Sequence, residues 1–139
     1  MTPEDRQTIL RVAEWAMQHK RKAMSMLREL ANTEENYLII VRELDRVNAQ
    51  IFQARAQHAA ATLTLVDWIK TLDHFEWHCA YCRERPFQIM SHYLPLQLAG
   101  TTSTNCVPAC YSCRANRKKE SPVIQAYLNS IAHGSIDAV

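Results

Sequence analysis

The sequence predicts a mainly helical protein with a small α+β part towards its carboxyl end. The first 72 residues contain one proline, Pro3, and no glycine, so nothing within them breaks a helix. From residue 73 onwards prolines and aromatic residues gather over about 35 residues, close to the paired cysteines, which is typical of short strands and loops around a metal ion. These observations predict two parts, a helical arm over residues 1–72 and a cysteine module with a terminal helix over residues 73–139.

The composition is that of a water-soluble chain with one small core. Of the 139 residues 47% are apolar, and no apolar run approaches the roughly 20 residues that a membrane-spanning helix needs. The first residues, MTPEDRQTIL, are charged and lack the apolar segment of a secretory signal. We therefore expect a cytoplasmic protein that does not contact a membrane. In that reducing compartment the cysteines favour metal binding over disulfides.

Two long helices are predicted in the arm. The first runs from about Glu4 to Leu30. Its apolar stripe follows helical spacing and consists of Leu10, Ala13, Met17, Met24, Leu27 and Ala31. Asn32 or Thr33 is then expected to cap a second helix over residues 34–72. Between Gln53 and Thr64 the apolar stripe of this helix is made mainly of alanines, and we expect the helix to bend there or to pack closely against a partner.

Apolar stripes on two helices cannot be buried by those helices alone. The arm therefore either folds as an antiparallel hairpin that serves as scaffold for the cysteine module, or pairs with a second chain in a homodimer. The sequence does not choose between these two arrangements. Beyond the arm, Phe87 to Leu94 is the best strand candidate, and Ser121 followed by Pro122 predicts the start of a terminal helix.

The cysteines predict a structural metal site. Cys79 and Cys82 form one C-x2-C pair and Cys110 and Cys113 another, separated by 27 residues. Four thiolates surround Zn²⁺ tetrahedrally, and a two-residue spacer lets each tight turn direct both sulfurs at one ion. Four protein ligands leave no open position, so we expect structural Zn²⁺. The remaining Cys106 is expected to be a buried small apolar residue.

Charge is distributed unevenly along the chain. Residues 1–75 carry ten basic and ten acidic side chains, whereas residues 76–120 carry six basic against three acidic ones. The positive excess therefore accompanies the cysteines, as a polyanionic partner would require. Its densest part is the run that follows the second cysteine pair and contains Arg114, Arg117, Lys118 and Lys119. We expect this run to bind nucleic acid; the alternative is a solvated helix face.

The order of the motifs WHCAYC, SHYLP and GTTSTNCVPACYSCRANRKK resembles the HNH endonucleases with a ββα-metal fold, in the subgroup braced by zinc between two C-x2-C pairs. The similarity covers residues 77–120. It implies His92 as the general base that activates water and Asn105 as the residue that braces the loop. It also implies DNA as the partner, contacted by the basic run, and a second divalent cation, Mg²⁺ or Mn²⁺, at the phosphate.

The sequence departs from this family at both positions that hold the second cation. Ser91 stands where the family has an acidic residue, and Arg114 stands where its helix has Asn or His. Serine is a poor ligand for a hard divalent cation, and an arginine repels one. Three functions therefore remain open: an HNH-type endonuclease, an HNH-like module that binds nucleic acid without cutting it, and a rigid structural end for the helical arm.

Overall fold

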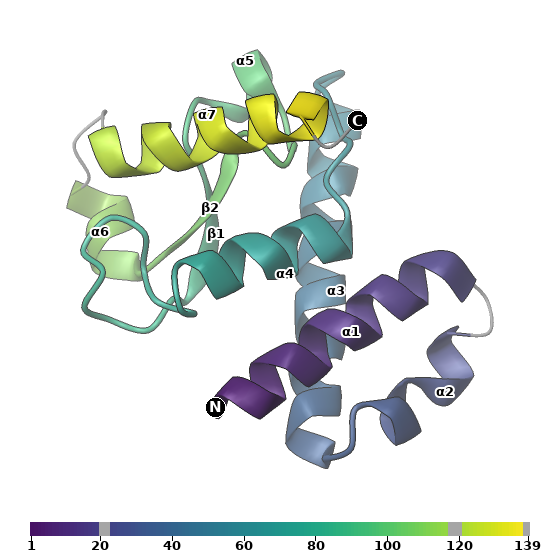
Figure 1. Cartoon of the computed structure of the whole chain (residues 1–139). Coiled ribbons are helices and arrows are strands. Elements are labelled where there is room, and N and C mark those ends of the chain that lie inside the picture. The colour runs from purple at the N-terminus through teal and green to yellow at the C-terminus, as the bar shows by residue number, and fades with distance from the viewer. Residues whose placement is uncertain (20–22, 117–120, 138–139) are drawn as a thin grey trace.

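The computed structural model describes residues 1–19, 23–116 and 121–137, and over these residues the protein is mainly helical with a two-stranded antiparallel sheet (Figure 1). The helices are α1 (Pro3–His19), α2 (Ala23–Leu30), α3 (Glu34–Ala56), α4 (Leu65–His74), α5 (Leu96–Ala99), α6 (Tyr111–Asn116) and α7 (Pro122–Asp137). The strands are β1 (Ile89–His92) and β2 (Cys106–Ala109). No described helix is both long enough and apolar enough to cross a membrane.

The prediction of a single helix from Glu4 to Leu30 is wrong. Helix α1 ends at His19, and α2 begins at Ala23 and packs back against α1 (Figure 1). The two halves of the apolar stripe therefore meet each other, so that Leu27 and Ile9 are buried in one core. A continuous helix would instead have carried the second half of the stripe away from the first.

The prediction of one continuous helix over residues 34–72 is also wrong. Helix α3 ends at Ala56, within the segment between Gln53 and Thr64 where we expected a bend or close packing. The amide of Ala59 donates to the carbonyl of Ala54 at 2.8 Å, and the amide of His58 donates to that of Arg55 at 3.1 Å. His58 has a φ of 55°, in the left-handed region. These bonds form a Schellman motif, which satisfies the last carbonyls of α3 and turns the chain away from the helix axis.

Helix α4 begins after an N-terminal cap at Thr64. The side chain of Thr64 accepts a hydrogen bond from the amide of Asp67 at 3.2 Å, which satisfies one of the free donors at the start of the helix. The expected cap at Thr33 is confirmed, because its hydroxyl accepts from the amide of Asn36 at 3.1 Å. The arm thus consists of four helices rather than a two-helix hairpin.

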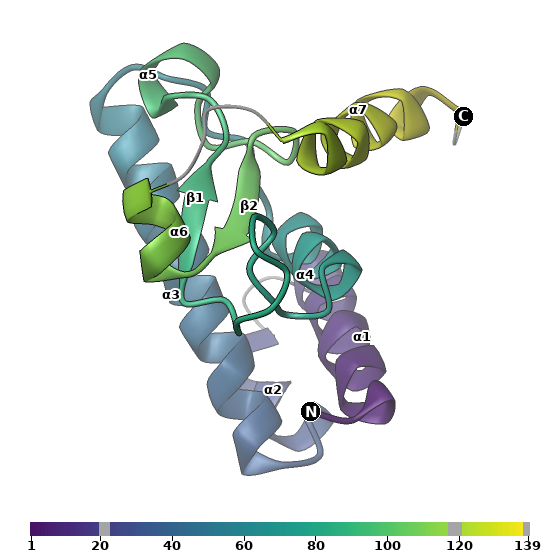
Figure 2. The same cartoon turned by 90° about the vertical axis from the view of Figure 1, so that its left-hand side faces the viewer.

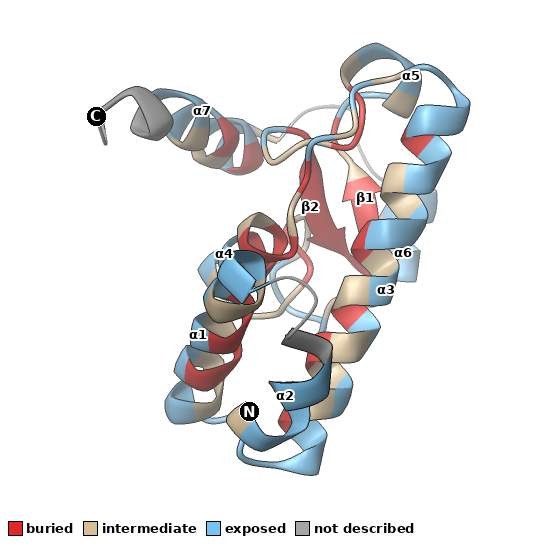
Figure 3. Cartoon of the chain, turned by 90° about the vertical axis from the view of Figure 1, so that its right-hand side faces the viewer, coloured by how far each residue is buried: buried red, intermediate tan, exposed pale blue. Residues whose placement is uncertain are grey.

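The main core joins the helical arm to the sheet. Buried residues of α1 to α4, among them the fully buried Trp68, pack together with Met90 of β1 and Cys106 of β2. Figure 3 shows buried segments of α1, α4, β1 and β2 in red. The core therefore crosses residue 72, where we expected the boundary between the two parts. Cys106 is a buried apolar residue as expected, and burial raises the pKa of its thiol to about 12.

The strand predicted between Phe87 and Leu94 is confirmed over Ile89–His92. It pairs with β2 in antiparallel register, with Ile89 opposite Ala109 and His92 opposite Cys106. Figure 2 shows both strands beside α3, with α6 following β2. Helix α7 begins at Pro122 as predicted, and the hydroxyl of Ser121 accepts from the amide of Ile124 at 3.3 Å.

Candidate functional site

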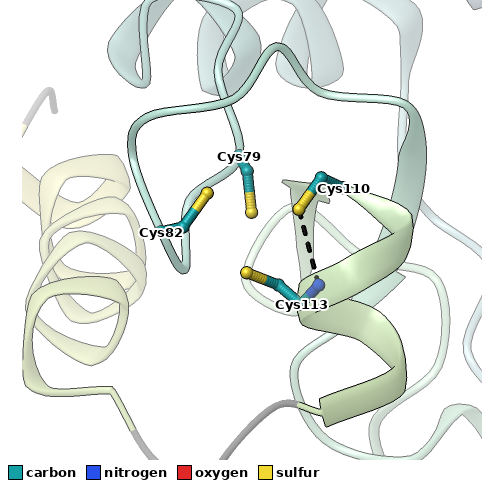
Figure 4. A group of neighbouring side chains, drawn as sticks. All are labelled: Cys79, Cys82, Cys110 and Cys113. Atoms are coloured by element: carbon teal, nitrogen blue, oxygen red, sulfur yellow. Dashed lines mark hydrogen bonds between the residues drawn. The ribbon is translucent and has the colours of Figure 1, made fainter.

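The four paired cysteines converge on one point. Cys79 and Cys82 lie in the loop after α4, Cys110 follows β2 directly, and Cys113 lies in α6 (Figure 4). Their sulfur atoms all lie within 4.8 Å of one another, which forms a four-cysteine cluster that could hold a metal ion. The convergence that the spacing predicted is therefore present in the structure.

Backbone hydrogen bonds fix the turn that carries the first cysteine pair. The amide of Cys79 donates to the carbonyl of Arg85, and the amide of Arg83 donates to the carbonyl of Cys79, both at 2.8 Å. Arg83 has a φ of 61°, which reverses the chain after Cys82. The amide of Ala80 donates to the carbonyl of Pro108 at 2.8 Å. This last bond ties the turn to β2 and thereby brings the two pairs together.

The thiols do not share one protonation state in the absence of a cation. Burial raises the pKa of the Cys79 thiol, and burial together with a hydrogen bond to Cys110 raises that of Cys113 to about 12. Burial also opposes ionisation of Cys110, but hydrogen bonds from Cys113 and the nearby Arg85 guanidinium outweigh it and lower its pKa to about 6. Four thiolates together therefore require a cation.

The cluster fits a tetrahedral thiolate site. A Zn–S length of about 2.3 Å places four sulfurs roughly 3.8 Å apart, so an approach within 4.8 Å needs only a small contraction. Cys79 and Cys110 are fully buried, while Cys82 and Cys113 are partly exposed. The amide of Cys113 donates to the sulfur of Cys110 at 3.4 Å, a bond that orients this sulfur towards the other three.

A cavity of about 420 Å³ lies beside β1. Ser91, His92 and Arg114 all line it, so the structure brings together the three residues that the resemblance placed around the second cation. Two further polar side chains reach the cavity from α3, which lies outside the segment covered by the resemblance. The full lining is Arg46, Gln50, Ile89, Met90, Ser91, His92, Pro95, Leu96 and Arg114.

The imidazole of His92 is oriented by a buried hydroxyl. Its Nε2 lies 2.9 Å from Oγ1 of Thr101, and this hydroxyl donates to the carbonyl of Gln50 at 3.2 Å. Thr101 is fully buried. Because the single hydroxyl proton goes to Gln50, the network assigns the imidazole proton to Nε2.

Asn105 braces the loop between the strands. Its Oδ1 accepts from the amide of Leu94 at 2.8 Å, and its Nδ2 donates to the carbonyls of Leu94 at 3.1 Å and of Gly100 at 2.8 Å. The side chain is buried and does not line the cavity. It therefore holds the loop that carries Thr101, whose hydroxyl meets His92.

The charged groups of the cavity favour an anion. Among the described residues, its lining contains two arginines, Arg46 and Arg114, and no carboxylate. Sequence reasoning missed Arg46. The i,i+4 spacing of Arg46 and Gln50 places both on one face of a helix, but it does not indicate what that face meets. Arg117, Lys118 and Lys119, also expected to bind nucleic acid, lie outside the described residues.

Comparison with known proteins finds no matching family model, no matching curated protein and no matching solved structure. Fold and site together define a helical protein with a small antiparallel sheet and a four-cysteine cluster beside a basic cavity.

Proposed function

We propose that this protein is an HNH-like module, stabilised by structural Zn²⁺, that binds nucleic acid, specifically DNA, at the cavity beside β1. The observation that carries the proposal is the convergence of Ser91, His92 and Arg114 on one cavity. These residues come from two segments whose order, β1 then β2 then α6, is that of a ββα-metal finger. The four-cysteine cluster lies at the junction of β2 and α6, where the related subgroup carries its zinc.

The zinc ion would be held by Cys79, Cys82, Cys110 and Cys113 and would supply folding free energy rather than chemistry. It would join the loop after α4 to the start of α6. Arg114 follows Cys113 directly, so the same ion would fix the helix that carries this arginine to the cavity.

Binding without cleavage is the function that the geometry supports best. Efficient hydrolysis in this family requires a divalent cation held by a carboxylate and by a helix residue. Here the hydroxyl of Ser91 and the guanidinium of Arg114 stand in those places, and no carboxylate lines the cavity among the described residues. Two arginines suit the phosphate backbone directly, because guanidinium and phosphate form charge-assisted hydrogen bonds.

Hydrolysis is a second candidate, favoured by the position of His92 in the lining of the cavity. The imidazole of His92 would take a proton from water as the water oxygen attacks phosphorus and the bond to the leaving oxygen breaks, and solvent water would protonate the leaving oxygen. A bound Mg²⁺ or Mn²⁺ would supply charge stabilisation at the phosphate. This candidate requires cation ligands that the lining described above lacks.

Two assays separate the candidates. Fluorescence anisotropy with labelled duplex DNA over a series of NaCl concentrations is expected to show binding whose affinity falls steeply with salt. A plasmid-nicking assay with Mg²⁺ and with Mn²⁺ is expected to show no cleavage. Nicking that is lost in His92→Ala and retained in His133→Ala, an exposed histidine of α7, would instead establish the endonuclease.

Absence of both binding and nicking would contradict the proposal and leave the structural function. In that case the property to measure is dimerisation through the N-terminal helices. Size-exclusion chromatography with light scattering gives the molar mass of the protein in solution. A dimer that persists after substitutions in the basic run would support an assembly function.

A further inference from the structure

We propose that Arg46 of α3 and Arg114 of α6 bind one phosphate of the nucleic-acid backbone directly between them, without a divalent cation. This inference rests on the proposed function and assigns its ligand contact. It adds a residue from the helical arm to a site that the sequence placed wholly within the cysteine module. The arm is then part of the binding site as well as scaffold.

Arg46 is held in place before any ligand arrives. Its Nε donates to Oε1 of Glu43 at 2.8 Å, its Nη1 donates to the carbonyl of Gln88 at 3.0 Å, and its guanidinium lies 5.2 Å from the centre of the Phe87 ring. A guanidinium has five N–H donors, so donors remain beyond these two bonds. A fixed side chain loses less conformational entropy on binding, which favours affinity.

The carboxylate that holds Arg46 does not neutralise the cavity. Glu43 is fully buried and accepts from Arg46, from Arg42 at 2.8 Å and from the indole of Trp68 at 3.0 Å. One negative charge is thus shared by two guanidinium groups, which leaves an excess of one positive charge. Arg114 is exposed and forms no ion pair with the described residues. Within residues 1–19, 23–116 and 121–137, no carboxylate therefore compensates the excess positive charge that lines the cavity.

The cavity has the size and the chemistry for a phosphodiester group. Its volume of about 420 Å³ is within the range of small-ligand sites. Arg46 and Arg114 both line it, and His92 lines it as well. Two guanidinium groups can each donate to the nonbridging oxygens of one phosphate. A cation at the same place would be repelled by both.

The test compares variants of the full chain in DNA-binding titrations. Arg46→Gln and Arg114→Gln are each expected to weaken binding about ten-fold and to reduce the dependence of log K on log salt by about one. Because both side chains bind the same phosphate, the double variant should lose much less than the product of the two single losses. Addition of Mg²⁺ at constant ionic strength should not tighten binding by the native protein.

Arg42→Gln is the matched control. Arg42 also pairs with Glu43 at 2.8 Å on the same helix, but it does not line the cavity. Any loss of affinity that comes only from disturbing Glu43 should therefore appear in Arg42→Gln as well as in Arg46→Gln. Arg114 is exposed, so its replacement does not threaten folding, and the proposal stays testable if Arg46→Gln is unstable.

A second measurement does not depend on DNA. Dimethyl phosphate, a phosphodiester monoanion, is titrated into ¹⁵N-labelled protein, and the Nε–H signals of Arg46 and Arg114 are expected to shift. If DNA binds but Arg46→Gln and Arg114→Gln both behave like Arg42→Gln, this inference is wrong while the proposed function stands. If DNA binding requires Mg²⁺, the proposal that the phosphate binds without a divalent cation is wrong. If DNA does not bind and dimethyl phosphate shifts neither signal, both the proposed function and this inference are wrong.

Discussion

At the scale of single residues, Gly100 couples the arm to the loop that orients His92. Its φ is 74°, and a Cβ added there would lie 2.3 Å from the carbonyl oxygen of Ala60. This close approach lets the amide of Thr101 donate to the same oxygen at 2.8 Å. The backbone of the α3–α4 connection thus fixes Thr101, whose hydroxyl then meets His92. Only glycine satisfies both the left-handed conformation and the close approach.

Replacement of Gly100 by alanine is expected to lower the free energy of unfolding by about 1–3 kcal/mol, because strained φ values cost that much before the steric clash is added. Chemical denaturation monitored by circular dichroism measures the change. The control is Gly134→Ala within α7, where alanine is expected to stabilise the helix by about 0.5–1 kcal/mol. Equal denaturation midpoints for Gly100→Ala and the native protein would contradict this account of the loop.

At the scale of elements, the ends of the helices decide the shape of the arm. The Schellman turn after α3 and the Thr64 cap of α4 redirect an apolar stripe that the sequence presents as continuous. Trp68 and Ile69 of α4 are thereby buried with Ile9 of α1. Each cap contributes only about 1 kcal/mol, but the burial that it permits is larger, about 1.5–3 kcal/mol for each large apolar side chain.

Thr64→Ala is expected to destabilise the protein by about 1 kcal/mol, because it removes the acceptor for the amide of Asp67. Thermal or urea unfolding measures the loss. Thr62→Ala serves as the control, since Thr62 is exposed and contributes its backbone amide, which the substitution retains. A loss as large for Thr62→Ala as for Thr64→Ala would show that the capping bond is not its cause.

At the scale of the whole molecule, the cysteine cluster and the cavity depend on the same elements. The cluster joins the loop after α4 to β2 and α6, and the cavity lies between β1, α3 and α6. The second core, formed around Val107, Ile124 and Leu128, packs α7 against the sheet. If the cluster holds a metal ion, its loss would release α6 together with Arg114, even though the main core of α1 to α4 contains none of the four cysteines.

Metal removal is expected to lower the thermal midpoint by roughly 10 °C or more, because structural zinc contributes several kcal/mol to folding and 1 kcal/mol shifts the midpoint by a few degrees. Elemental analysis should find about one zinc per chain, lost on chelation. Acidification should release the metal too, because protons compete for the thiolates.

Cys113→Ser is expected to lose metal without a chelator. Cys106→Ser is the matched control, because Cys106 is buried in the main core away from the cluster, so this variant should keep its metal even if it is less stable. Equal metal content in the two variants would contradict the assignment of the four ligands.

The sequence by itself determined the features of this protein that depend on neighbouring residues: the cysteine cluster, the start of α7 and the strand around His92. The two C-x2-C pairs predicted the cluster because each spacer fits one turn, and Ser121 with Pro122 predicted the start of α7 because capping depends on adjacent residues. The strand around His92 followed from its composition and from flanking turn residues. The order of these motifs also indicated which residues to compare with a ββα-metal finger.

Only the tertiary structure decided where the long stripes break and what the cavity contains. A cap or a left-handed residue such as His58 changes the free energy by about 1 kcal/mol, so periodicity alone cannot show whether a helix continues or turns back to bury its stripe. Arg46 reaches the cavity because α3 packs beside the sheet. Arg46 there donates to the carbonyl of Gln88, which lies 42 residues further along the sequence. Such contacts depend on how distant segments pack, and no local pattern specifies that packing.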